Sequence, residues 1–273
     1  MGILNVTPDS FFDGGTFVEP GAAIAHGERM AAEGADVIDV GGESTRPGAE
    51  PVPLQEELRR VLPVIEPLAT ALEVPLSIDT SKAAVARAAL AAGARFVNDV
   101  TALRGDPEMA EAVAEAGVDV CLMHMKGEPR TMQDEPRYDD VVSEVKSFLE
   151  QRLSAAVAAG IEERRIWLDP GIGFGKSLQH NLELLRRLAE VVALGRPVLV
   201  GASRKGFVGR LTGRPEPERL AGSLAAAVLA VERGAAMVRV HDVAPTRDAL
   251  LVAGGTLGEP DAPGAEVGSE GGN

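Results

Sequence analysis

Residues 76–82 read LSIDTSK, and this segment shows the pattern that decides the fold, a short apolar run that ends on a carboxylate. Seven other apolar runs of strand length end in the same way on an amide, a carboxylate, a histidine or a serine; they span residues 2–5, 37–39, 96–99, 122–124, 166–169, 199–203 and 237–241. Val, Ile and Leu are frequent in these runs, as they are in strands buried on both faces of a parallel sheet. If eight such strands close into a barrel, their C-terminal ends meet on one face and their polar groups form a single site.

Ala-rich amphipathic segments of helical length separate these runs, at roughly 20–34, 53–72, 81–93, 107–117, 139–160, 178–194, 216–234 and 244–257. The repeated alternation of strand and helix predicts a parallel α/β sheet covered by helices. Eight units, without a dinucleotide-binding fingerprint after the first strand, favour a single (β/α)8 TIM barrel over an open doubly wound sheet. We expect the barrel to span residues 1–257 and the polar tail 258–273 to be disordered.

Composition restricts the partners of the protein. The 273 residues include 41 acidic and 27 basic ones, and the formal net charge of -14 opposes binding to nucleic acid and to anionic membranes. There is no apolar stretch long enough to span a bilayer and no opening segment typical of export, so the sequence predicts a cytoplasmic protein. The single Cys121 lies in an apolar run, which fits a buried thiol in a reducing compartment.

Eight motifs, one for each strand, carry a resemblance to a known family. They are MGILNVTPDSFFDGG (1–15), DVGGESTRPGA (39–49), SIDTSK (77–82), VNDV (97–100), CLMHMKGEPRTMQ (121–133), LDPGIGFGKS (168–177), VGASRKGFVG (200–209) and RVHDV (239–243). Up to about residue 257 the chain resembles the dihydropteroate synthases of folate biosynthesis. The resemblance implies a transferase that joins 6-hydroxymethyl-7,8-dihydropterin pyrophosphate to p-aminobenzoate, giving 7,8-dihydropteroate and pyrophosphate. It also implies a homodimer and competitive inhibition by sulfonamides, which mimic p-aminobenzoate.

The residue types at the strand ends suit recognition of a pterin. A flat pterin has an edge of donors and acceptors, and carboxylates and amides in a dry pocket select for such an edge because unpaired polar groups there reject other ligands. N-capping of a following helix or turn is the structural alternative for a strand-end aspartate. Together with the match to the family, these considerations give the predicted pterin-binding set Asp79, Asn98, Met123, Asp169, Phe174, Gly201 and Lys205.

A second group of strand-end residues suits the pyrophosphate. Arg239 and His241 alternate along one strand, so their side chains point to the same face and can clamp an anion. Lys205 is expected to serve both the pterin and the leaving group. Asn5 offers a carbonyl oxygen to Mg²⁺, the cation that the resemblance implies, although an Asn that caps the following turn is the alternative.

The loop at residues 44–48, STRPG, resembles the mobile substrate loop of the family. Thr45 offers a hydroxyl group, and Arg46 is expected to pair with the aminobenzoate carboxylate or with the departing pyrophosphate. The family mechanism is dissociative, and Asp79 stabilises the cationic pterin methylene that forms when pyrophosphate leaves. The resemblance therefore implies the catalytic set Arg46, Asp79, Lys205, Arg239 and His241.

Two further observations bear on these expectations. The segment GIGFGKS (171–177) is not a phosphate-binding P-loop, because Pro170 stands where that motif requires the first glycine. Gly206 stands where the family often has a serine.

Two rival functions are a methyltransferase of the same superfamily that transfers a methyl group from a methylated folate to a corrinoid, and a non-catalytic pterin-binding paralogue. The STRPG loop and the RVHDV segment argue against the first, and the polar residues of the long loops argue against the second.

Overall fold

The computed structural model describes residues 1–7, 20–44, 49–127, 131–132 and 134–257 of the 273-residue chain. The expectations for Thr45, Arg46 and the tail 258–273 lie outside these residues. Eight short strands occur in the described part: β1 (Gly2–Asn5), β2 (Ile38–Gly41), β3 (Leu76–Asp79), β4 (Phe96–Asp99), β5 (Asp119–Met123), β6 (Ile166–Asp169), β7 (Leu199–Val200) and β8 (Met237–Val238).

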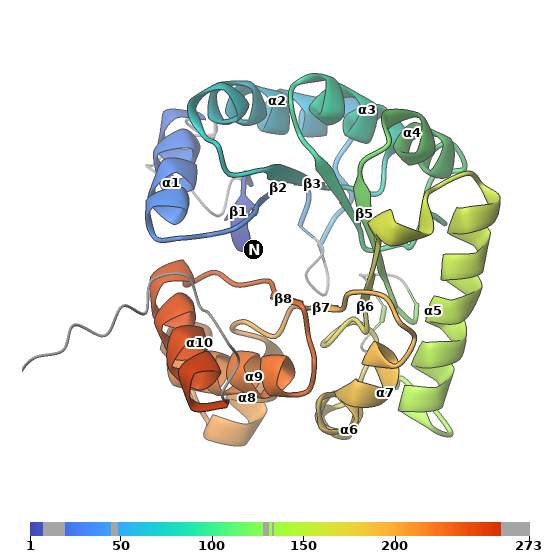
Figure 1. The fold of residues 1–273 in the computed structure, drawn as a ribbon, viewed down its shortest axis with the longest axis vertical. Coiled ribbons are helices and arrows are strands. Elements are labelled where there is room, and N and C mark those ends of the chain that lie inside the picture. Colours follow the sequence, from blue (N-terminus) through green and yellow to red (C-terminus); the bar gives the residue numbers. More distant parts are fainter. Residues whose placement is uncertain (8–19, 45–48, 128–130, 133, 258–273) are drawn as a thin grey trace, which may run out of the picture.

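The strands close into a parallel barrel (Figure 1). Strands β1 to β6 pair in chain order, and β7 pairs with β8. A parallel bridge between Leu168 and Val198 joins the two sheets on one side, and a bridge between Gly2 and Val240 joins them on the other. The predicted (β/α)8 barrel is therefore confirmed, and the strand ends converge on one face as expected.

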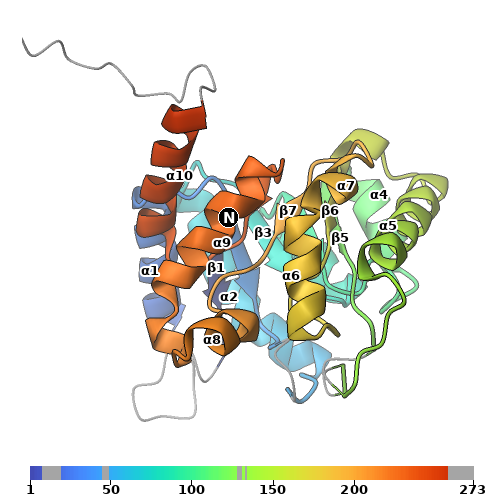
Figure 2. The ribbon, with the colours of Figure 1, turned by 90° about the horizontal axis from the view of Figure 1, so that it is seen from below.

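Helices form a ring around the strands (Figures 1 and 2). They are α1 (Pro20–Ala32), α2 (Leu54–Ala71), α3 (Ala83–Ala91), α4 (Met109–Ala116), α5 (Val141–Ala158), α6 (Leu178–Arg186), α7 (Leu188–Val192), α8 (Gly206–Thr212), α9 (Leu220–Glu232) and α10 (Val243–Leu257), with two 3₁₀ turns, η1 (Glu163–Arg165) and η2 (Glu216–Glu218). Helix α8 was not predicted from the sequence, because it is short and contains two glycines, and α6 and α7 were predicted as one helix. The last two strands are shorter than predicted, because regular pairing stops at Val200 and Val238.

Alternation along the strands divides the core into two parts. Aliphatic side chains such as Leu4, Ile38 and Val97 belong to the large cluster that also contains the helix residues Val61 and Leu149. A separate cluster fills the inside of the barrel at the N-terminal ends of the strands; its buried members are Met1, Val37, Phe96, Cys121 and Leu199, and Trp167 and Met237 pack against them. This apolar cluster supports the polar groups that lie above it.

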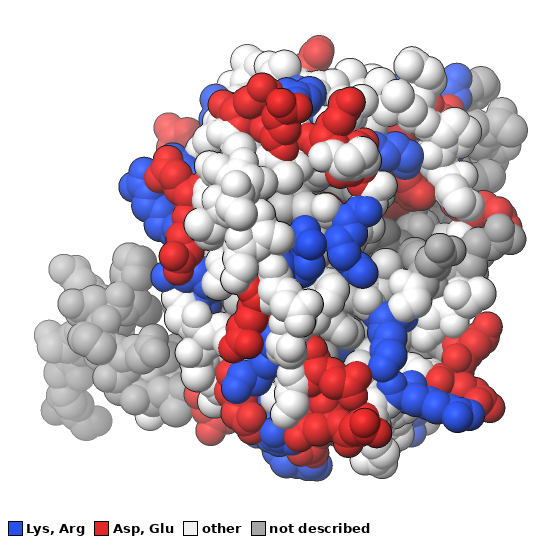
Figure 3. Space-filling view, turned by 90° about the vertical axis from the view of Figure 1, so that its right-hand side faces the viewer, with Lys and Arg blue, Asp and Glu red and all other residues white. Residues whose placement is uncertain are grey.

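The molecular surface carries mixed charge on the side that includes α5. Figure 3 shows Lys and Arg side chains interspersed with Asp and Glu on this face. Within the described residues, there is no helix that combines the length and the hydrophobicity needed to cross a membrane.

Candidate active site

A cavity of about 1050 Å³ opens at the C-terminal end of the barrel. Six of the predicted site residues line it: Asn5, Asp79, Phe174, Lys205, Arg239 and His241. Four others do not form its wall, namely Asn98, Met123, Asp169 and Gly201. Asn98 and Asp169 are nevertheless buried beside residues that line it, since Asn98 is the register partner of Asp79 and the charge of Asp169 acts on that of Lys205.

Arg239 is the centre of a buried ion-pair network. Its Nε donates to Oδ2 of Asp39 at 2.6 Å, and its Nη2 donates to Oδ2 of Asp79 at 2.8 Å. Burial raises the pKa of Asp79 to about 7, although the charge of Arg239 acts in the opposite direction. Burial also opposes the charge of Arg239, but Asp39 and Asp79 raise its pKa above the ordinary value. The alternation of Arg239 and His241 predicted an anion clamp but not the two carboxylate partners of Arg239, and Asp39 was not predicted as a site residue.

Lys205 lines the cavity and contacts the loop after β6. Its Nζ donates to the backbone carbonyl of Ile172 at 2.6 Å and lies 4.1 Å from the centre of the Phe174 ring. Burial lowers the pKa of Lys205 to about 8, with Asp169 acting in the opposite direction. The ammonium group and the aromatic ring thus form one wall, with a cation placed beside a flat apolar surface.

The glycine-rich segment after β6 is held by a buried lysine that the sequence analysis did not assign. Nζ of Lys176 lies 2.9 Å from Nδ1 of His124 and donates to the carbonyl groups of Gly171 at 2.8 Å and Phe174 at 2.9 Å. Burial lowers the pKa of Lys176 well below its ordinary value. Gly171 has φ +67°, and a Cβ atom there would lie 1.9 Å from the carbonyl oxygen of His124. The segment therefore packs backbone against backbone, and Phe174 packs against the methionine cluster of Met123, Met125 and Met132.

The methionine cluster completes the apolar side of the site. Met123, Met125 and Met132 are buried together with Val100, and Phe174 packs against them. Asp169 faces this region, and its Oδ1 accepts a hydrogen bond from the backbone of Gly171 at 2.7 Å. Burial raises the pKa of Asp169.

The ends of β7 and β8 are joined by side chains. Oγ of Ser203 lies 3.0 Å from Nδ1 of His241 and accepts a hydrogen bond from the backbone nitrogen of His241 at 3.2 Å. Arg204 donates to both carboxylate oxygens of Asp242, at 2.9 and 2.5 Å. These contacts fix His241, which lines the cavity.

The donor set for a metal is sparse. Among the described residues there is no group of three or more His, Cys, Asp or Glu side chains that could hold a metal ion. Asn5 lines the cavity beside Asp79, since a Cβ atom built on Gly41 would lie 3.8 Å from Oδ1 of Asn5 and 3.6 Å from Oδ2 of Asp79. One amide oxygen beside an anion site fits Mg²⁺, because this ion is often bound by one or two protein oxygens together with substrate phosphates.

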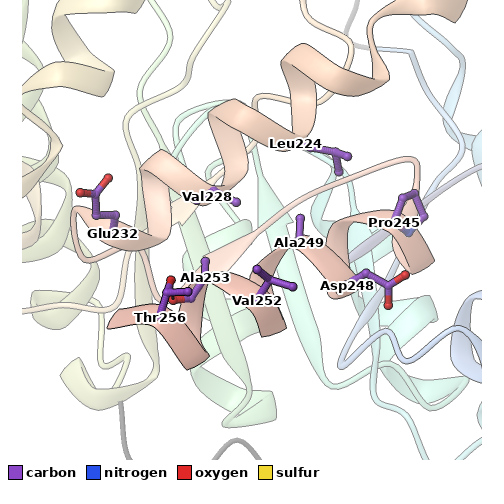
Figure 4. Close-up of a pocket in the computed structure, with 9 residues that line it drawn as sticks. All are labelled: Leu224, Val228, Glu232, Pro245, Asp248, Ala249, Val252, Ala253 and Thr256. Atoms are coloured by element: carbon purple, nitrogen blue, oxygen red, sulfur yellow. Dashed lines mark hydrogen bonds between the residues drawn. The ribbon is translucent and has the colours of Figure 1, made fainter. Parts of the chain in front are cut away.

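A second cavity, of about 640 Å³, lies on the outside of the barrel between α9 and α10 (Figure 4). Leu224 and Val228 of α9 face Ala249 and Val252 of α10 across it. We refer to this surface as the α9–α10 groove. Its lining is mostly aliphatic, so it fits a packing surface better than a reaction site.

Known proteins resemble this chain over almost its full length. The model of the family described as pterin binding enzyme matches residues 1–241. The dihydropteroate synthase of Escherichia coli K12 is 51% identical over 257 residues, which cover 94% of this chain and 91% of that protein. The chain belongs to the dihydropteroate synthase family.

Solved structures of this family superpose on the barrel. The Xanthomonas albilineans dihydropteroate synthase with 4-aminobenzoic acid is 56% identical, with a TM-score of 0.90, and the match covers 95% of this chain and 93% of that one. A structure of the enzyme from the same organism with 7,8-dihydropteroate has a TM-score of 0.86 at 53% identity, covering 95% and 94%. The Yersinia pestis dihydropteroate synthase with a sulfonamide drug has a TM-score of 0.90 at 49% identity, covering 94% and 93%.

Proposed function

We propose that this protein is a dihydropteroate synthase, which condenses 6-hydroxymethyl-7,8-dihydropterin pyrophosphate with p-aminobenzoate to give 7,8-dihydropteroate and pyrophosphate. The observation that carries the proposal is the meeting of Asp79, Lys205 and Arg239 at one cavity, on strand ends distant in sequence. The family membership and the 4-aminobenzoic acid, dihydropteroate and sulfonamide complexes of its relatives support it. We also propose that sulfonamides inhibit this protein in competition with p-aminobenzoate, as the resemblance to the family implies.

The pterin is assigned to the floor of the cavity. Asp79, Asn98 and Asp169 supply carboxylate and amide groups to its polar edge, and Lys205 supplies a cation. Phe174 and Met123 supply apolar contact with the ring plane, and Gly201 leaves the room that the ring needs. Each of these polar groups is buried or nearly so, which makes an unmatched ligand edge unfavourable.

The pyrophosphate is assigned to the basic rim. Lys205, Arg239 and His241 line the cavity and lie on two adjacent strand ends, β7 and β8. Thr45 and Arg46, outside the described residues, are proposed to reach the same region. Asn5 would hold Mg²⁺ through its side-chain oxygen, and the ion, when bound, neutralises charge on the leaving group.

Catalysis is proposed to follow from fixed charge. The bond between the pterin methylene carbon and the pyrophosphate oxygen breaks first, and the cationic groups of Lys205 and Arg239, together with the imidazole of His241, stabilise the departing anion. The carboxylate of Asp79 stabilises the resulting methylene cation. The amine of p-aminobenzoate then forms the C–N bond, and its acidic anilinium proton passes to water. Arg46 is proposed to hold the aminobenzoate carboxylate or the leaving group.

The test is pyrophosphate release from the purified protein with the pterin pyrophosphate and Mg²⁺, with and without p-aminobenzoate. We expect release that depends on p-aminobenzoate and yields dihydropteroate, and we expect it to fall about 100-fold or more in Asp79→Ala. Asp36→Ala, an exposed carboxylate before β2, is the matched control and should retain activity. Pterin binding without turnover in the unmodified chain would instead identify a non-catalytic paralogue.

We also propose that the protein is a homodimer whose subunits meet at the α9–α10 groove. Four of the six large apolar side chains that are exposed among the described residues lie on these two helices, namely Leu220, Leu229, Leu251 and Val252, and Val252 lines the groove itself. Such a concentration marks an interaction surface, and a second copy of this chain is the occupant that the family resemblance implies. Sedimentation analysis should find a dimer that Val252→Asp converts to a monomer. Val157→Asp, at an equally apolar exposed position on α5, should remain dimeric.

A further inference from the structure

We propose that Asp39 is a positioning residue of the active site, whose carboxylate holds Arg239 and Asn98 in the arrangement that the pterin pyrophosphate requires. This inference rests on the proposed function and deepens it. The side chain of Asp39 has no exposed surface, whereas Asn98 and Asp169, which are assigned to the pterin, remain 4% and 5% exposed. Asp39 therefore acts on the substrate only through the groups that it binds.

The carboxylate of Asp39 joins three strands. Its Oδ2 accepts from Nε of Arg239 at 2.6 Å and from Nδ2 of Asn98 at 2.9 Å. Strand β2 pairs with β1 and β3, whereas Asn98 lies on β4 and Arg239 follows β8. Backbone pairing of β2 with its neighbours therefore does not fix the side chains of Asn98 and Arg239 relative to each other. The carboxylate oxygen that both side chains bind fixes them across the inside of the barrel.

Gly41 provides the space for this arrangement. It lies two residues after Asp39 and therefore points to the same side of β2, one layer nearer the cavity. A Cβ atom at this position would lie 3.4 Å from Cβ and 3.6 Å from Oδ2 of Asp79. With no side chain at Gly41, the groups of Asp79 and Arg239 occupy the layer above Asp39.

The charge balance indicates a functional role. Oδ1 of Asp39 is buried and has no hydrogen-bond partner within the described part of the chain. A buried carboxylate that is only half satisfied is unfavourable for stability, and an uncharged residue would fill the position with less penalty. Asp79, the other partner of Arg239, faces the cavity and is available to the substrate. Asp39 thus keeps Arg239 in place when Asp79 binds the pterin.

The kinetic test uses Asp39→Asn, which preserves the shape and removes the charge. We expect the KM for the pterin pyrophosphate to rise about tenfold or more, while the KM for p-aminobenzoate changes less than about twofold. The matched control is Ser77→Ala, the register partner of Asp39 on β3, whose buried Oγ has no hydrogen-bond partner among the described residues; neither KM should change. A loss that affects both substrates equally, or no loss, would overturn the proposal.

Coupling to Arg239 is tested by a double-mutant cycle. If Asp39 acts chiefly through Arg239, adding Asp39→Asn to an Arg239→Met variant reduces kcat/KM by less than about threefold further, a remainder that comes from the lost contact with Asn98. Effects that multiply in full would show that the two residues act independently, and the inference would be wrong.

A stability cycle separates this inference from the proposed function, because it uses no substrate. Arg239→Met leaves the buried charge of Asp39 without its cation, so the thermal unfolding midpoint should fall. The double variant Asp39→Asn/Arg239→Met removes both charges and should unfold at a higher temperature than Arg239→Met alone. A double variant no more stable than Arg239→Met would refute the pairing, whatever the wild-type turnover. An inactive wild type with an intact stability cycle would instead refute the proposed function.

Discussion

The inside of the barrel has an apolar layer and a polar layer, which are formed by the same strands. The two layers lie only two residues apart along each strand. On β4, on β6 and at the end of β8, an apolar residue is followed two positions later by a polar one on the same inward face: Phe96 by Asn98, Trp167 by Asp169 and Met237 by Arg239. The lower residues form the apolar cluster, and the upper ones surround the cavity. Because the side-chain period of a strand is two, neighbouring layers of one barrel can have opposite chemistry.

The difference separates stability from activity. The lower layer removes apolar surface from water, which stabilises the fold by roughly 25 cal/mol per Å². The upper layer buries several charges, and buried charges are unfavourable unless they are paired. Asp39, Asp79 and Arg239 satisfy one another only in part, so this layer depends on the rigid layer beneath it. Three substitutions test this division.

The largest expected effect is on stability. Phe96→Ala should lower the free energy of unfolding by about 3–5 kcal/mol, because Phe96 is buried and its ring packs 5.9 Å from the ring of Trp167. Urea unfolding measures this loss. KM values recorded well below the new unfolding midpoint should stay within about twofold of wild type. Val157→Ala, at an exposed position of α5, should change stability by less than about 0.5 kcal/mol. Equal damage to stability and substrate binding would show that the layers are not separable.

The next effect is on activity without loss of stability. Lys205→Met should lower kcat/KM for the pterin pyrophosphate about 100-fold, about 2.7 kcal/mol, because it removes a cation from the cavity wall. The free energy of unfolding should stay the same or rise, since burial disfavours the charged form of Lys205. Steady-state kinetics and urea unfolding of the same sample provide both values. Lys146→Met on α5 is the control. A marked loss of stability in Lys205→Met would contradict the assignment.

The smallest effect appears in the pH dependence. Burial lowers the pKa of Lys205 to about 8, so the ammonium group is charged below this pH and becomes neutral above it. The value of kcat/KM for the anionic pterin pyrophosphate should therefore fall above about pH 8, by up to tenfold per pH unit. Lys205→Arg keeps its charge in this range and should not show that falling limb. A limb that persists in Lys205→Arg would assign the titration to another group.

Much of this molecule was predictable from local patterns. The alternation of apolar runs and Ala-rich helices predicts the barrel, because eight parallel strands with covering helices bury such runs completely. The strand-end positions of Asp79, Lys205 and Arg239 predict that they meet. Short elements were less predictable: α8 has only seven residues and two glycines, and its position depends on the loop after β7 rather than on its own helix propensity.

The roles of Asp39 and Lys176 required the tertiary structure. The sequence shows Asp39 at the end of an apolar run, yet β2 continues to Gly41 and places Asp39 one layer below the cavity. The sequence also shows a lysine in GIGFGKS, and nothing in the motif indicates that its Nζ lies among carbonyl groups from two loops. The sequence by itself determined the barrel, the layer chemistry and the residues at the strand ends, because these follow from periodicity and burial. The partners of each buried charge were decided only by the closed barrel, because they come from strands and loops far apart in the chain.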